Sequence, residues 1–271
     1  MASEQRTPIT VGIGGLGAIG MAIARRLDAG LPGLTLSAVS ARDRLAAAER
    51  LAGFAVPPPV VGLAELPGLA EVVVECAPAA VFAEVAEPTV EAGGTLMTLS
   101  CGALLQRFDL VERARETGAR ILVPSGALLG LDAVRAAAQG TITSVRMITR
   151  KPPRSLAGAP HLERNGIDLS NLDGPLKVFE GSAREGAVGF PANVNVAAAL
   201  SLAGIGPDET RLEVWADPAL DRNTHRVVVE ADSARFEMAI ENVPSPTNPG
   251  SGRITALSVI AALERLTAPL V

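Results

Sequence analysis

The sequence predicts an α/β protein with a doubly wound parallel sheet in its N-terminal half and a second α/β domain with a mixed sheet. Three observations lead to this prediction. Strand and helix patterns alternate from residue 10 to residue 123, a glycine-rich turn follows the first strand, and the alternation ends near Gly126. Beyond that point strands follow one another with fewer helices between them, as in a mixed or antiparallel sheet.

The expected strands of the first half are short, apolar and rich in β-branched residues, which is typical of a parallel sheet covered on both faces. Helical patterns lie between them, and glycines follow three of these patterns as C-terminal stops. We expect strands over residues 10–14, 34–40, 72–76, 95–99 and 120–123, and helices over residues 18–29, 42–52, 80–92 and 108–117.

The turn after the first strand reads Gly15-Leu16-Gly17-Ala18-Ile19-Gly20. In this spacing the first glycine allows a tight turn, the second lets the backbone approach a pyrophosphate, and the third lets the helix pack closely on the strand. The helix N-terminus then points its N–H groups at the phosphates. We therefore predict a Rossmann-type dinucleotide site with Gly15, Leu16, Gly17, Ala18 and Ile19 in contact with the cofactor; the alternative is a glycine-rich turn without a ligand.

The end of the second strand bears on the choice between NAD and NADP. An acidic residue there usually binds the ribose 2′-hydroxyl of NAD, but this strand ends in Ser40 and Ala41. Arg42 and Arg44 follow, and an arginine can pair with a 2′-phosphate. Asp43 can still reach the ribose if the turn is short. We expect NAD or NADP as the cofactor, with Arg42 in contact with it.

The second half is expected to contain five strands, a crossing helix and a last helix, over residues 144–149, 176–180, 213–216, 226–230 and 234–240, residues 194–203, and residues 253–266. The last helix carries an apolar stripe that can pack on either domain, formed by Ile254, Leu257, Ile260 and Ala261. We divide the chain into a dinucleotide-binding domain (1–125), a substrate-binding and catalytic domain (126–250) and a C-terminal helix (251–271) that can pack back on the first domain.

Composition excludes several classes of protein. The 271-residue chain has a net charge of −5 and no basic run, so nucleic acid is not an expected partner. No apolar stretch approaches the length of a membrane span, and the N-terminus has no apolar signal region. Cys76 and Cys101 fall in predicted buried strand regions, which favours reduced core thiols. We expect a cytoplasmic protein that acts on a small molecule, without a metal site.

Few side chains are candidates for acid–base chemistry. The chain has two histidines. His161 lies in a loop-like stretch and is expected at the surface, whereas His225 comes just before a predicted strand among short polar residues. A lone histidine is more often structural than catalytic, and both alternatives stay open on these residues alone. Asn193 and Asn195 mark a helix start, where either is a cap or a partner for a carboxamide.

Six motifs spread in order across almost the whole chain resemble the L-aspartate dehydrogenase family. They are Gly15-Leu16-Gly17-Ala18-Ile19-Gly20, Ser125-Gly126-Ala127 with Gly130-Leu131-Asp132, Lys151-Pro152-Pro153, Phe190-Pro191-Ala192-Asn193-Val194-Asn195-Val196, Asp217-Pro218 with Asn223-Thr224-His225, and Glu241-Asn242-Val243-Pro244-Ser245 with Asn248-Pro249. The chain departs from the family's pattern in the following Gly250-Ser251-Gly252.

The resemblance implies reversible conversion of L-aspartate to oxaloacetate and ammonia through iminoaspartate, with NAD or NADP, in a homodimer. This reaction serves either aspartate breakdown or the supply of iminoaspartate to pyridine nucleotide biosynthesis. The family's active-site histidine falls on His225, and its cofactor-contacting residues fall on Ala127 and Asn195. We expect Lys151 and Asn193 to bind the substrate, because a dicarboxylate needs cations or hydrogen-bond donors.

Two alternatives stay open. The first is another small oxidoreductase, similar to homoserine dehydrogenase or dihydrodipicolinate reductase, which would use a catalytic lysine in the second domain; Lys151 and Lys177 are the only lysines. The second is a non-catalytic dinucleotide sensor, although the sequence shows no DNA-binding segment that would serve as its effector module.

Overall fold

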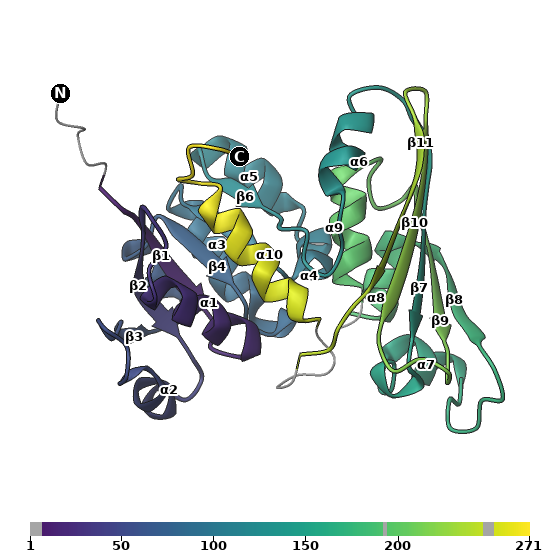
Figure 1. Cartoon of the computed structure of the whole chain (residues 1–271), viewed down its shortest axis with the longest axis horizontal. Coiled ribbons are helices and arrows are strands. Elements are labelled where there is room, and N and C mark those ends of the chain that lie inside the picture. The colour runs from purple at the N-terminus through teal and green to yellow at the C-terminus, as the bar shows by residue number, and fades with distance from the viewer. Residues whose placement is uncertain (1–6, 192–193, 246–251) are drawn as a thin grey trace. The chain divides into compact units, whose positions relative to one another are not determined.

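The chain forms two compact units in a computed structural model that describes residues 7–191, 194–245 and 252–271 (Figure 1). The first unit comprises the described parts of Met1–Ser100, Arg107–Pro124 and Ala256–Val271. The second comprises Cys101–Gln106 and the described parts of Ser125–Thr255.

The first unit is built on a parallel six-stranded sheet in the order β3-β2-β1-β4-β5-β6. The strand order reverses between β1 and β4, so this unit is the doubly wound sheet that the sequence predicts. Its strands are β1 (Ile9–Gly14), β2 (Leu34–Ser40), β3 (Val60–Val61), β4 (Val72–Glu75), β5 (Thr95–Thr98) and β6 (Arg120–Leu122). Its helices are α1 (Ala18–Asp28), α2 (Arg44–Leu51), η1 (Leu63–Gly68), η2 (Ala79–Val81), α3 (Phe82–Glu91), α5 (Asp109–Thr117) and most of α10 (Arg253–Glu264).

The last helix, α10, completes the core of the first unit. Val259 and Leu263 are fully buried there among residues of β1, α1 and β2. Of the predicted stripe, Ile260 packs against this core, but Leu257 is 60% exposed and Ile254 is 38% exposed. The helix is apolar on most of its circumference, so its sequence pattern does not single out one buried face.

The second unit contains a five-stranded sheet in the order β11-β10-β7-β9-β8. The strands β7 and β9 run parallel and the other neighbours run antiparallel, which confirms the predicted mixed sheet. The strands are β7 (Ile142–Lys151), β8 (Leu176–Ser182), β9 (Thr210–Ala216), β10 (Thr224–Ala231) and β11 (Arg235–Glu241). The helices are α4 (Cys101–Gln106), α6 (Leu131–Ala137), η3 (Pro153–Ser155), α7 (Pro160–Asn165), α8 (Ala183–Gly189) and α9 (Asn195–Ala203).

Four of these helices are not predicted from the sequence. They are α4, α6, α7 and α8, each of six or seven residues. Fewer than two turns give too little periodicity to recognise. Cys101 accordingly begins α4 and does not lie in a strand, and Cys76 comes directly after β4. Neither cysteine forms a disulfide bond.

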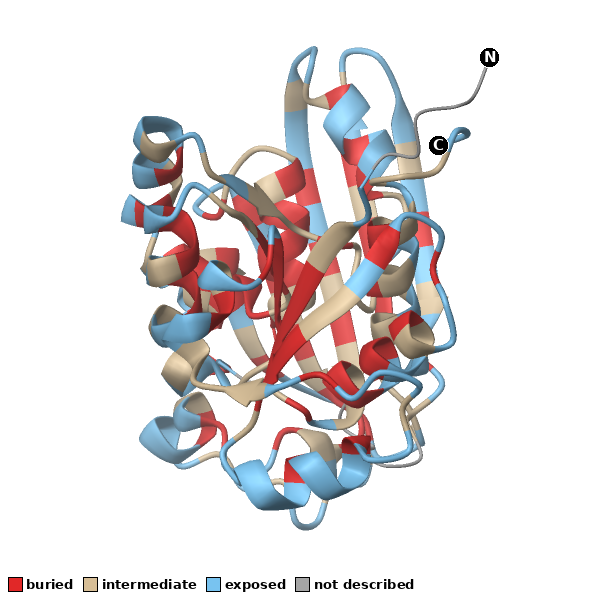
Figure 2. Ribbon diagram, turned by 90° about the vertical axis from the view of Figure 1, so that its left-hand side faces the viewer, coloured by how far each residue is buried: buried red, intermediate tan, exposed pale blue. Residues whose placement is uncertain are grey.

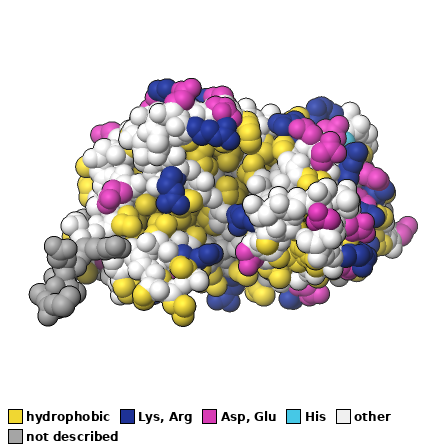
Figure 3. Space-filling view, turned by 90° about the horizontal axis from the view of Figure 1, so that it is seen from above, with side chains coloured by type: hydrophobic (Ala, Val, Ile, Leu, Met, Phe, Trp, Pro, Cys, Tyr) yellow, Lys and Arg dark blue, Asp and Glu magenta, His cyan; other side chains and the backbone are white. Residues whose placement is uncertain are grey.

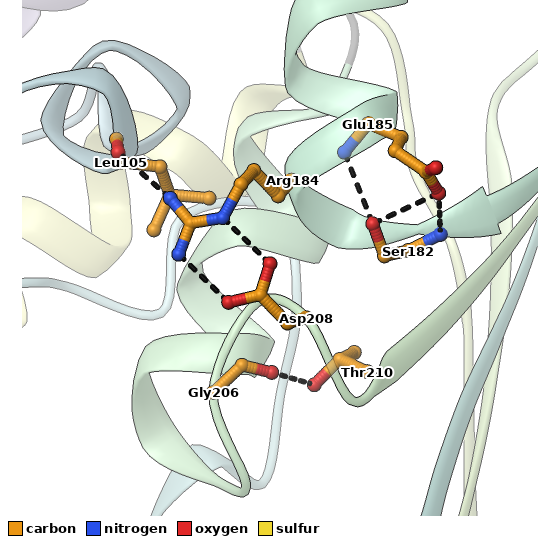
Figure 4. Close-up of polar contacts among 7 residues, drawn as sticks. All are labelled: Leu105, Ser182, Arg184, Glu185, Gly206, Asp208 and Thr210. Carbon is orange, nitrogen blue, oxygen red and sulfur yellow. Dashed lines mark hydrogen bonds and ion pairs between the residues drawn. The ribbon is translucent and has the colours of Figure 1, made fainter.

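Side-chain hydrogen bonds join three parts of the second unit around α8 (Figure 4). Ser182 and Glu185 form a capping box at the start of α8, where the Ser182 hydroxyl accepts a hydrogen bond from the Glu185 N–H at 3.2 Å. Arg184 donates to both carboxylate oxygens of Asp208, at 2.6 and 2.9 Å, and to the Leu105 carbonyl of α4 at 3.3 Å. These contacts group α4 with the second unit although its neighbours in sequence belong to the first.

The strand β7 alternates strictly between two environments. Val145, Met147, Thr149 and Lys151 are buried, whereas the intervening residues are more accessible. Figure 2 shows such buried residues along the strands and exposed residues on the outer sides of the helices. Thr149 and Lys151 are therefore polar residues at buried positions of this strand.

Two further observations concern possible large partners. In the described residues no helix is both long and apolar enough to cross a lipid bilayer. On the face that Figure 3 shows, positive and negative side chains lie interspersed.

Candidate active site

The glycine-rich turn of the first unit has the shape that a dinucleotide requires. Gly15 has a φ of 108°, and a Cβ there would lie 2.8 Å from the Cys76 carbonyl oxygen. A Cβ on Gly20 would clash with the Gly15 carbonyl oxygen, so only glycine lets α1 start this close to the turn. Gly17 has open space where its Cβ would be, which leaves the start of α1 accessible. The three glycines thus form a cradle that fits a pyrophosphate.

The residues after β2 differ in whether their side chains are available to bind a cofactor. The Asp43 carboxylate accepts a hydrogen bond from the Ala46 N–H at 3.0 Å and caps α2. Arg44 lies 3.6 Å from the Glu65 carboxylate. Arg42 is exposed and forms no ion pair within the described part of the chain. Asp43 is thus engaged in its own helix, which disfavours it as the ribose ligand.

The most unusual polar cluster lies on the buried face of the second sheet. His225 is the second residue of β10 and stands directly opposite Thr149 of β7. The His225 Nδ1 and the Thr149 hydroxyl are 3.2 Å apart. Lys151 ends β7 two residues further on, so it shares the face of Thr149. His225 and Lys151 are only 3% and 4% exposed.

Burial sets the charges of this cluster. It lowers the pKa of His225 to about 3, and the nearby charge of Lys151 acts in the same direction. Burial also lowers the pKa of Lys151 to about 8. At neutral pH the cluster therefore pairs an uncharged imidazole with a mostly protonated amine. A neutral base beside a cation suits the removal of a proton from a substrate that carries negative charge.

The hydrogen bond between the Thr149 hydroxyl and the His225 Nδ1 is a feature that the sequence does not predict. Its signal is weak, because a threonine in a strand is ordinary and the register between β7 and β10 is not readable from one sequence. Since the hydroxyl occupies Nδ1, the other ring nitrogen of His225 is the one that remains for a substrate.

Asn242, which follows β11, was named only within a motif and not as a site residue. Its side-chain amide donates to the Ala127 carbonyl at 3.0 Å, and its N–H donates to the Asn223 carbonyl at 2.9 Å. A Cβ on Gly252 would lie 2.8 Å from the Asn242 Oδ1. Asn242 thus ties the Ala127 turn to the strand that carries His225.

The other predicted site residues are placed as follows. Asn195 begins α9, and its Oδ1 accepts a hydrogen bond from the Gly102 N–H of α4 at 3.0 Å. It therefore caps a neighbouring helix, with the amide nitrogen outside that bond. Asn193 lies outside the described residues. His161 is not a surface loop residue: it lies in α7, half-buried, with its ring 5.2 Å from the rings of Phe179 and Phe190.

Comparisons with known proteins identify the family to which the chain belongs. A family model described as "Aspartate dehydrogenase, C-terminal" matches residues 132–266. An L-aspartate dehydrogenase of Bradyrhizobium diazoefficiens is 55% identical over 97% of this chain and 93% of its own length. The L-aspartate dehydrogenase 3 of Bordetella bronchiseptica is 53% identical over 98% of each chain. This chain belongs to the aspartate dehydrogenase family.

Solved structures extend this assignment of the aspartate dehydrogenase family to the fold. The aspartate dehydrogenase from Thermotoga maritima superimposes with a TM-score of 0.76 at 25% identity, covering 97% of this chain and 98% of the other. A homoserine dehydrogenase from Thiobacillus denitrificans, with a TM-score of 0.61 and 15% identity, shares the fold alone; it covers 96% of this chain and 73% of the other.

Within the aspartate dehydrogenase family the first unit is the NAD(P)-binding domain. A model described as "Homoserine dehydrogenase, NAD binding domain" matches residues 15–124. This match explains why a homoserine dehydrogenase-like enzyme is a reasonable alternative from the glycine turn alone. The predicted family, the dehydrogenase class and the NAD(P) cofactor are confirmed.

Proposed function

We propose that this chain catalyses the reversible oxidative deamination of L-aspartate to oxaloacetate and ammonia through iminoaspartate. The observation that carries the proposal is the buried cluster of His225, Thr149 and Lys151, in the part of the chain that matches the aspartate dehydrogenase model. A neutral imidazole and an ammonium on one face supply a base and a carboxylate ligand for an anionic amino acid.

The dinucleotide would be held by the cradle of the first unit, in contact with Gly15, Leu16, Gly17, Ala18 and Ile19. When bound, NAD(P)⁺ accepts the hydride that leaves the Cα of aspartate. In the second unit, Ala127 and Asn195 are the further contacts that the family resemblance implies. Asn242 supports this role of Ala127, because it fixes the Ala127 carbonyl.

His225 acts as the base in this proposal. Burial keeps the imidazole neutral at working pH, so one ring nitrogen can accept a proton from the substrate ammonium or from the water that attacks the imine. The negative charge of a bound dicarboxylate would raise the pKa of His225 from its lowered value and so strengthen it as a base. Thr149 acts as a positioning residue, because its hydroxyl holds one ring nitrogen and turns the other toward the substrate. In the reverse direction the same imidazole returns the proton.

Lys151 binds a substrate carboxylate in this proposal, with Asn193 as a further ligand. The backbone carbonyl of Lys151 accepts a hydrogen bond from the Asp217 N–H at 2.8 Å, and Pro152 follows it. Both features hold the end of β7 in place. A fixed ammonium recognises a carboxylate at a lower entropic cost than a mobile surface lysine does.

We also propose that the enzyme accepts NADP as well as NAD. The support lies in the end of β2, where Asp43 is committed to capping α2 and Arg42 is exposed. Because Asp43 is engaged as the cap of α2, the exposed Arg42 can pair with a 2′-phosphate at this end of the strand.

A reductive amination assay tests the proposed function. Oxaloacetate, ammonium and the purified protein are mixed with NADH or NADPH, and the loss of reduced cofactor is followed. We expect turnover with oxaloacetate but not with pyruvate or 2-oxoglutarate, and with both cofactors. Binding of the reduced cofactor without turnover of oxaloacetate would favour another substrate or a dinucleotide sensor.

We also propose, from the family resemblance, that the protein is a homodimer and that it is located in the cytoplasm. Cys76 and Cys101 are both reduced, which supports a reducing compartment. Light scattering distinguishes a monomer of 27.7 kDa from a particle of twice that mass. A monomeric mass under assay conditions would contradict the homodimer.

A further inference from the structure

The first unit contains a buried carboxylate that the proposed reaction does not use. Glu75 is the last residue of β4 and is fully buried. One of its carboxylate oxygens, Oε2, accepts hydrogen bonds from the Thr98 hydroxyl at 2.8 Å and the Ser100 N–H at 3.0 Å. The other, Oε1, accepts one from the Ser100 hydroxyl at 3.0 Å. Glu75 therefore holds the turn that follows β5.

The charge of this carboxylate has no opposite charge beside it. None of the ion pairs within the described ranges involves Glu75. Burial raises the pKa of Glu75, and the hydrogen bonds from Ser100, Thr98 and Leu99 oppose the rise. A carboxylate that accepts this many hydrogen bonds is satisfied as an acceptor but stays uncompensated in charge. A cation that arrives nearby is thus stabilised by it.

The position of Glu75 indicates which cation can come close to its carboxylate. Glu75 stands opposite Gly14 in the pairing of β4 with β1, and the next residue, Cys76, touches the Gly15 turn. The strand order reverses at this point, where a dinucleotide crosses the carboxyl ends of a doubly wound sheet. A bound dinucleotide would place its adenosine ribose toward the end of β2, so its nicotinamide half would lie on the side of β4 and β5.

We propose that Glu75 is a positioning residue beneath the nicotinamide half of the cofactor, and that its carboxylate favours the oxidised ring over the reduced one. The inference rests on the NAD(P) site of the proposed function. The oxidised ring carries one positive charge, and a hydride, with its proton and two electrons, makes the ring neutral. A buried negative charge near the ring therefore acts on one redox form only.

The variant Glu75→Gln tests this inference, because glutamine keeps the shape of the side chain and removes its charge. The Kd values of NAD⁺ and NADH are measured by calorimetry without any amino acid. We expect NAD⁺ to lose roughly threefold to tenfold more affinity than NADH. Equal losses for the two forms would overturn the inference and leave Glu75 with a purely structural role.

The matched control is Ser100→Ala, which removes one hydrogen bond to Glu75 and keeps the carboxylate. It should change the two Kd values by the same factor, so the ratio between them stays that of the wild type. If the ratio changes as much as in Glu75→Gln, the geometry of the turn and not the charge sets the preference, and the inference fails.

Infrared difference spectra of the wild type cover the case in which Glu75→Gln does not fold. We expect the NAD⁺ complex to show no protonated-carboxyl band, since the inference needs an ionised Glu75. Such a band, shifted by Ser100→Ala, would overturn it. These binding measurements need no aspartate, so an altered ratio in a protein that fails to oxidise aspartate would contradict the proposed function alone.

Discussion

At the scale of single residues, the cluster of His225, Thr149 and Lys151 depends on cross-strand register. A shift of one residue between β7 and β10 would turn His225 to the other face of the sheet. The apolar neighbours Met147 and Val227, which are themselves paired, hold this register because they must stay buried. The packing of an apolar face thus positions the polar cluster.

His225→Asn should lower kcat by about 10²- to 10⁴-fold, the usual effect of losing a general base. The Kd of NADH should stay at the wild-type value, because His225 lies outside the dinucleotide cradle. Stopped-flow kinetics and calorimetry check the two parts. The matched control is His161→Gln, at the chain's other histidine, which should leave kcat unchanged. Full turnover by His225→Asn would remove its role as the base.

Lys151→Met should raise the KM for oxaloacetate by about 10- to 100-fold, as expected for the loss of one charge-assisted contact. In the wild type this KM should rise above pH 8, where Lys151 loses its proton, and the variant should lack this pH dependence. Steady-state kinetics from pH 6 to 10 checks both. The exposed Lys177 supplies the control, Lys177→Met, with an unchanged KM. If the KM of Lys151→Met depended on pH as it does in the wild type, Lys151 would be excluded as the carboxylate ligand.

The lowered pKa of Lys151 also affects stability. Between pH 8 and 10.5 the unfolded chain keeps the proton that the folded chain has lost, so the free energy of unfolding should rise with pH. The rise from this group is about 3 kcal/mol at most, and Lys151→Met should lack it. A wild-type stability that falls over this range by as much as that of the variant would contradict the buried state of Lys151.

At the scale of elements, two substitutions in the glycine turn should have different effects on the stability of the fold and on cofactor binding. Gly17→Ala should leave the melting temperature unchanged, because its Cβ meets open space, but should weaken NADH binding at least tenfold by obstructing the pyrophosphate. Gly20→Ala should lower the melting temperature as well, because its Cβ clashes with the Gly15 carbonyl. Calorimetry measures both quantities. Gly53→Ala, also in open space, is the control that should change neither; tight NADH binding by Gly17→Ala would contradict the cradle.

The elements also show how far the sequence predicts the structure. The strand over residues 34–40 is predicted to the residue, because Leu34, Leu36 and Ala38 alternate with small polar residues directly after a glycine turn. The six- and seven-residue helices of the second unit are missed, because fewer than two turns give too little periodicity. At α8 the local signal is the Ser182 and Glu185 capping box, which was not recognised. For the site, the sequence indicates His225 and Lys151, whereas the Thr149 contact and the charge states need coordinates.

At the scale of the whole molecule, the chain returns to its first unit at the end. The helix α10 follows the second unit in the sequence, and its Val259 and Leu263 are buried in the core of the first unit. Arg26 of α1 also donates to the Glu264 carboxylate at 3.1 Å. The dinucleotide-binding unit therefore needs both ends of the chain, so a fragment of residues 1–125 lacks part of its core.

Leu263→Ala should cost about 2–5 kcal/mol in the free energy of unfolding, as expected for a fully buried leucine. Leu257→Ala, in the same helix but 60% exposed, should cost within about 0.5 kcal/mol. Urea unfolding followed by circular dichroism compares them. Equal costs for the two variants would mean that α10 does not pack by the face described here.

In the proposed function, this chain moves a hydride from the Cα of L-aspartate to a nicotinamide ring. The most direct test uses L-aspartate with deuterium at Cα, oxidised NAD or NADP, and mass spectrometry of the products. The account predicts deuterated reduced cofactor, with oxaloacetate and ammonia in equal amounts. Reduced cofactor without deuterium, or no reduced cofactor from a protein that binds NAD⁺, would contradict it.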